Sequence, residues 1–199
     1  MINRVNTSWM HGLRLLFAGG LVFLFLAFQQ HKKEDWLHWK SPDQLSAADF
    51  KKKHPGRPVK SKWGKRSYRV LEGFIQIGVA FSYSSINGRL KTLEVYSYMV
   101  PEDSWLLDQT NLSTLEHEQA HFNIAEIYAR VLRKKLRVGM KVDQARRLYQ
   151  QTLKDMKKRQ QSFDQDHTGE NGVTEKWKLT IKEELKGLDS WSAKRSLSE

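Results

Sequence analysis

The stretch that decides the fold is residues 112–132, which read LSTLEHEQAHFNIAEIYARVL. Its apolar residues recur at the spacing of a helix that buries one side, and they are Leu112, Leu115, Phe122, Ile124, Ala125, Tyr128, Ala129 and Leu132. Ser113 or Thr114 is expected to cap the start, because a side-chain oxygen there can accept a hydrogen bond from a free backbone N–H. The pattern therefore predicts a helix.

Within this predicted helix, His117-Glu118-Gln119-Ala120-His121 spells H-E-x-x-H. Two imidazoles four residues apart lie on the same helix face, so both can reach one metal ion. Glu118 is turned by about 100° from His117, which puts its carboxylate beside such a metal. Zn²⁺ lowers the pKa of a bound water toward about 7, and a neighbouring carboxylate can take the proton. The motif predicts a zinc site with Glu118 as general base; the alternative is two ordinary histidines and an incidental glutamate.

A catalytic zinc site needs a third protein ligand, while its fourth position is left to water. His167 is the expected third ligand, because the remaining histidines lie far upstream, at positions 11, 31, 38 and 54. It follows a second predicted helix, whose apolar stripe is Val142, Ala145, Tyr149, Leu153, Met156 and Phe163. If this helix returns antiparallel to the first, the loop at its end reaches the metal.

Two carboxylates next to His167 enlarge the candidate set. Asp164 is the alternative third ligand, and Asp166 is expected to orient a ligand imidazole through a hydrogen bond. Glu126 fits worse as a ligand, since nine residues past His117 place it about 180° round the same helix.

The strand pattern lies between Tyr68 and Val100. Apolar residues alternate along both halves, at Ile75, Ile77, Val79 and Phe81 and then at Leu93, Val95 and Met99. Asn87-Gly88 between them is the signal of a type I′ hairpin turn. A last helix is predicted from the stripe Trp177, Ile181, Leu185 and Leu188. We therefore expect an α+β fold, with a small antiparallel sheet packed on the H-E-x-x-H helix and further C-terminal helices.

The N-terminal segment, residues 1–30, is expected to be a signal peptide or a membrane anchor. Leu15 to Phe28 is almost entirely apolar and follows Arg4 and Arg14. Its length suits a signal peptide, but no small-residue cleavage site follows, which favours an uncleaved anchor. Residues 31–199 are expected to form a single domain. The chain has no cysteine, which excludes disulfides and thiolate zinc sites.

The charge of the chain is strongly basic, with a formal net charge of +12. Residues 31–69 hold nine Lys and three Arg against four acidic residues. This stretch suits anionic lipid headgroups or another polyanion, although a solvated basic surface is equally expected. Nucleic acid is the least favoured partner because no recognised binding motif accompanies the charge. The positive-inside rule would place this flank in the cytoplasm, against the signal-like N-terminus.

From Trp39 to Leu188 the chain resembles a bacterial family of zinc-dependent proteases, inferred to be secreted and long catalogued as a domain of unknown function. The markers are Trp39, the Leu45-x-x-x-Asp49-Phe50 opening, Ser104-Trp105, the run from His117 to Glu126, the Phe163-Asp164 pair and Trp177. The family places a histidine two positions later than His167, whereas Asp164 keeps its place.

The resemblance implies a zincin-like fold and a zinc metallopeptidase that hydrolyses protein or peptide substrates. It also implies a location in the cell envelope, as a periplasmic or extracellular domain held at the inner membrane by the N-terminal segment. The alternative function is a non-catalytic envelope protein that binds membrane or polyanion and carries a structural metal. A carboxylate beside the metal favours the enzyme, since a structural site has no need of one.

Overall fold

The computed structural model describes residues 35–55, 60–63, 67–166, 173–192 and 197–198. The fold is α+β, as predicted, with a small antiparallel sheet and three helices. The helices are α1 (Leu112–Lys135), α2 (Val142–Asp166) and α3 (Glu175–Gly187). Short 3-10 turns lie at η2 (Ala47–Asp49), η3 (Pro101–Asp103) and η4 (Asp189–Trp191).

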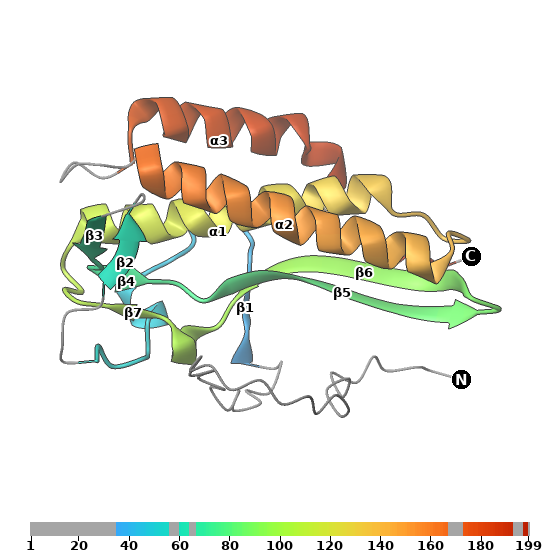
Figure 1. Ribbon diagram of the computed structural model, residues 1–199, viewed down its shortest axis with the longest axis horizontal. Helices are drawn as coiled ribbons and strands as arrows, with labels where there is room; N and C mark the ends of the chain where they lie inside the picture. The colour runs from blue at the N-terminus through green and yellow to red at the C-terminus, as the bar shows by residue number, and fades with distance from the viewer. Residues whose placement is uncertain (1–34, 56–59, 64–66, 167–172, 193–196, 199) are drawn as a thin grey trace, which may run out of the picture.

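The sheet is built on a long hairpin of β5 (Ile77–Ile86) and β6 (Arg89–Met99), and β1 (Leu37–His38) and β8 (Leu197–Ser198) both pair with β6. Two smaller antiparallel pairs join β2 (Lys60–Trp63) to β3 (Ser67–Val70) and β4 (Gly73–Phe74) to β7 (Trp105–Leu106). In Figure 1 the hairpin lies below α1 and α2, and α3 lies on top.

The hairpin confirms the predicted turn and alternation. Asn87 and Gly88 have φ values of 50° and 71°, and a type I′ turn requires positive φ at both positions. Along β6, Leu93, Val95 and Met99 are each 2% exposed or less, on the face that meets the helices. Because side chains alternate along a strand, this period of two fixes which face of the hairpin is buried.

Helix α1 is the centre of the core, because it packs on three sides. Ala129 and Leu132 pack on β5 and β6, while Ile124 and Ile127 pack on α3. A third side, at Phe122, meets the residues Leu45, Phe50, Ile75, Met99 and Leu106. A helix surrounded in this way also buries polar residues, and each of those needs a partner inside the protein.

The start of α1 differs from the prediction. Asn111, not Ser113 or Thr114, is the N-cap, and its side chain accepts a hydrogen bond from the Thr114 N–H at 3.1 Å. Asparagine is among the strongest N-caps, since its short side chain reaches the N–H three residues on. Thr114 is instead a buried residue of the first turn.

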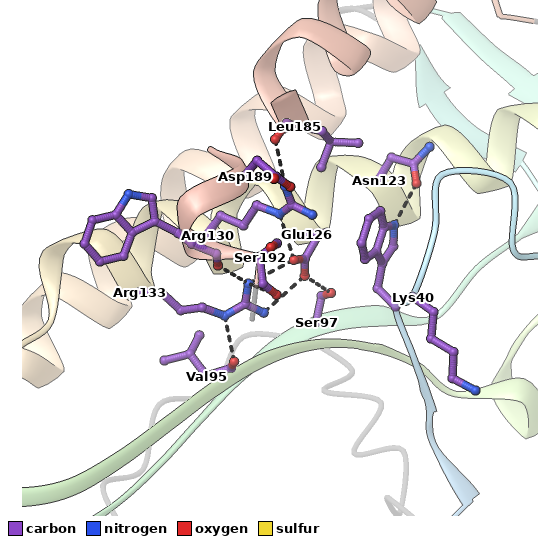
Figure 2. A network of polar contacts seen from close by, with 12 residues as sticks. Lys40, Val95, Ser97, Asn123, Glu126, Arg130, Arg133, Leu185, Asp189 and Ser192 are labelled. Carbon is purple, nitrogen blue, oxygen red and sulfur yellow. Dashed lines mark hydrogen bonds and ion pairs between the residues drawn. The ribbon is translucent and has the colours of Figure 1, made fainter. Parts of the chain in front are cut away.

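Glu126 is the most buried acidic residue of α1, and Figure 2 shows the network around it. Its carboxylate accepts hydrogen bonds from Arg130 Nε at 3.0 Å, Arg133 Nη1 at 2.9 Å and Ser97 Oγ at 2.6 Å. The guanidinium groups also donate to the backbone carbonyls of Val95, Leu185 and Trp191. The network therefore joins α1 to the sheet and to the end of α3.

The predicted N-terminal segment, residues 1–30, lies outside the described residues, as do parts of the basic stretch 31–69. Within the described ranges, no helix has the length and apolarity that a membrane span requires.

Candidate metal centre

His117 and His121 of α1 and Asp164 of α2 bring three potential ligand atoms together. The His117 and His121 Nε2 atoms are 3.0 Å apart, and Asp164 Oδ1 lies 3.3 Å from the first and 3.1 Å from the second. The antiparallel return of α2 beside α1 produces this meeting, because it brings the last turn of α2 back to the first half of α1.

The three atoms fit the ligand set of one metal ion. With metal–ligand bonds of about 2.0–2.2 Å, two ligands of a tetrahedral zinc are about 3.3 Å apart, close to the three observed separations. Within the described part of the chain, these residues are the group of three that could hold a metal. Two imidazole nitrogens and one carboxylate oxygen leave one tetrahedral position open.

The charges of the site shift the pKa values of Asp164 and His121 in opposite directions. Burial raises the pKa of Asp164, but hydrogen bonds from His117 and His121 outweigh it and hold that pKa well below its usual range. Burial lowers the pKa of His121, but Asp164 and the charge of Glu118 outweigh it and raise that pKa above its ordinary value. Asp164 is therefore a carboxylate at neutral pH, which is the form that binds a metal.

Glu118 is buried next to this group. The residue is 5% exposed, and its Oε1 lies 2.7 Å from the position that a Cβ on Gly73 would occupy. The same position is 2.8 Å from Thr114 Cγ2. The lack of a side chain at Gly73 therefore leaves the space that the Glu118 carboxylate fills, with β4 running directly against it.

Gln160 of α2 contacts His121 at two points. Its side-chain oxygen accepts a short hydrogen bond from the Nδ1 atom of His121, and its amide nitrogen donates to the His121 backbone carbonyl at 2.9 Å. The residue lies one turn before Asp164, so one face of α2 supplies both contacts to the site.

The structure brings together four of the predicted site residues: His117, Glu118, His121 and Asp164. Asp166 is the last residue of α2 and is exposed. His167 lies outside the described residues, so its role stays a prediction.

Sequence reasoning missed Gln160 and Gly73. A signal existed for Gln160, since it precedes Asp164 by four residues on the same helix. None existed for Gly73, whose meeting with Glu118 depends on tertiary packing.

Two further residues of the motif region hold residues 39–45 on α1. Gln119 accepts a hydrogen bond from the Leu45 N–H at 2.7 Å, and Asn123 accepts one from Trp39 Nε1 at 2.8 Å. Asn123 also donates to the Pro42 carbonyl at 3.0 Å. These contacts give Gln119 and Asn123 a structural role, separate from the helix face that carries His117 and His121.

In the basic stretch, the described lysines partly pair with acids. Lys51 lies 3.4 Å from Glu102 and Lys52 lies 3.8 Å from Asp103, both at the surface. Surface pairs of this kind contribute about 0–1 kcal/mol, but they reduce the charge that is available to a polyanion.

The chain matches no protein-family model, no curated protein and no solved structure.

Proposed function

We propose that this chain is a zinc-dependent peptidase with a zincin-like fold, in which His117, His121 and Asp164 hold the metal and Glu118 is the general base. The observation that carries the proposal is the meeting of three ligand atoms, 3.0–3.3 Å apart, together with the buried Glu118, whose charge acts on His121. A zinc ion bound there supplies Lewis acidity, which lowers the pKa of a water and polarises a carbonyl.

The chain's own groups supply the rest of the chemistry. Glu118 accepts the proton of the attacking water and can later deliver it to the leaving amine, as a general base and acid does. Burial of Glu118 beside Gly73 keeps the carboxylate in one place, so its orientation is fixed before the substrate arrives. Asp164 is 38% exposed, which leaves the site open to solvent and substrate on that side.

Strand β4 is the proposed binding site for the substrate backbone. Its residue Gly73 lies against Glu118, and among the described strands β4 pairs with β7 alone. An extended peptide that adds to a strand edge has its carbonyl groups held in register by backbone hydrogen bonds. Such a peptide would pass next to Glu118, which favours unstructured segments as substrates.

The second candidate function is a non-catalytic envelope protein with a structural metal. Structural zinc sites have four protein ligands, whereas the described site offers three and adds a buried carboxylate beside them. The site as described therefore favours catalysis.

The test is hydrolysis of an unstructured protein by the purified full chain. Denatured casein should be cleaved by the zinc-loaded protein, cleavage should stop on removal of zinc with a chelator, and added zinc should restore it. A zinc-loaded chain that leaves casein and a mixed peptide library intact would favour the non-catalytic alternative.

Gly73→Ala is expected to lower the rate of hydrolysis by about 10–100-fold at unchanged zinc content. The added methyl would meet Glu118 Oε1 at 2.7 Å, so the carboxylate has to move, and small displacements of a catalytic group cost rates of this order. Gly187→Ala is the control, because a Cβ at that position meets nothing within 4 Å. Equal activity of the two variants would show that the position of Glu118 does not depend on Gly73.

A further inference from the structure

The donor and the acceptor can be assigned in both hydrogen bonds between Gln160 and His121. The His121 backbone carbonyl can only accept, so the group of Gln160 that meets it at 2.9 Å is the amide nitrogen. The amide oxygen therefore faces Nδ1 of His121. Since an amide oxygen can only accept, the ring nitrogen that faces it carries a proton.

The proton on Nδ1 decides which nitrogen of His121 can bind a metal. A neutral imidazole carries one proton, and the proton on Nδ1 leaves the lone pair on Nε2. Nε2 is the atom that lies 3.0 Å from His117 Nε2 and 3.1 Å from Asp164 Oδ1. In the neutral, metal-binding form of His121, Nε2 is therefore the nitrogen that presents its lone pair to the other two ligand atoms.

We infer that Gln160 is a positioning residue for the metal centre: it fixes His121 in the Nδ1–H tautomer and orients Nε2 toward the metal. The inference rests on the metal site of the proposed function, and it adds a residue outside the three ligands. Gln160 and Asp164 lie one turn apart on α2, on the helix face that packs against α1. This face therefore supplies both the ligand Asp164 and the hydrogen-bond partner of the ligand His121.

The neighbouring Gln161 offers a matched control. It has the same side chain, lies about 100° round the helix and is exposed. A substitution there changes helix propensity and composition in the same way without touching His121.

The first measurement is the zinc affinity of the full chain, obtained by competition with a chromophoric chelator. Gln160→Leu should bind zinc about 10–100-fold more weakly, as is usual when the hydrogen-bond partner of a ligand histidine is lost. Gln160→Glu should bind zinc more tightly than Gln160→Leu, because its carboxylate still accepts from Nδ1–H although it no longer donates to the His121 carbonyl. Gln161→Leu should equal the wild type.

The second measurement reports the proton itself. In the Co²⁺-loaded full chain, the ring N–H of His121 should give a paramagnetically shifted proton resonance that exchanges slowly with water. Gln161→Leu should keep that resonance, and Gln160→Leu should lose it or broaden it by exchange. The wild-type resonance is a test even if Gln160→Leu fails to fold.

Each outcome decides the inference. Wild-type affinity in Gln160→Leu, an equal loss in Gln160→Leu and Gln160→Glu, or a wild-type ring N–H that exchanges freely would overturn it. A wild type that binds no metal would overturn the inference and the metal centre together. Zinc binding with the expected Gln160 effects but no peptide hydrolysis would leave the inference standing and remove only the proposed activity.

Discussion

Glu118→Gln is expected to keep its zinc and to lose at least about 100-fold in the rate of peptide hydrolysis. The amide has nearly the shape of the carboxylate, so the buried space beside Gly73 stays filled. It cannot take a proton from water, and general-base catalysis contributes about 10²–10⁴-fold. Glu118 is not one of the three grouped ligands, so zinc content should not change.

Initial rates at matched zinc content provide the measurement, and Glu183→Gln, an exposed substitution on α3, is the control. An active Glu118→Gln with wild-type kinetics would remove the general base from the proposal. A variant without zinc would show instead that Glu118 supports the metal.

Glu126→Ala is expected to lower the free energy of unfolding by about 3–5 kcal/mol, because it leaves two buried guanidinium groups without their carboxylate. Arg130 and Arg133 are each about 4% exposed or less, and both contact Glu126 at 3.0 Å or closer. The remaining hydrogen bonds and ion pairs of the two arginines go to backbone carbonyls and, for Arg130, to the exposed carboxylate of Asp189 at 3.7 Å. An exposed carboxylate at that distance does not replace the buried one of Glu126.

Urea unfolding of the full chain measures this effect, with Glu184→Ala as the matched control. Glu184 makes an ion pair of 2.9 Å with Arg159, but both side chains are at least 30% exposed, so the expected loss is under about 1 kcal/mol. Equal losses in the two variants would mean that the buried network contributes no more than a surface pair.

Local patterns were enough to predict most of the fold. The period of apolar residues predicted α1, and Asn87-Gly88 predicted the hairpin turn, because both signals depend on neighbours in the sequence. The cap was misassigned because Asn111, Ser113 and Thr114 are all capping residues, and only the backbone geometry selects among them.

The sequence predicted the parts of the site that lie on a single helix. The spacing of His117 and His121 placed both on one face, and the angle of Glu126 excluded it from the metal, which agrees with its position in the arginine network. The spacing could not choose between Asp164 and His167, since that choice depends on where α2 ends against α1. Gln160 and Gly73 act across elements, so their roles require the tertiary structure.

The most direct test of the zinc centre is a crystal of the zinc-loaded full chain, measured on both sides of the zinc absorption edge. We predict one anomalous peak per chain, within about 2.0–2.2 Å of His117 Nε2, His121 Nε2 and Asp164 Oδ1. A peak elsewhere, or a zinc bonded to His117 and His121 without Asp164, would contradict this ligand set. The same map would show whether His167 approaches the metal.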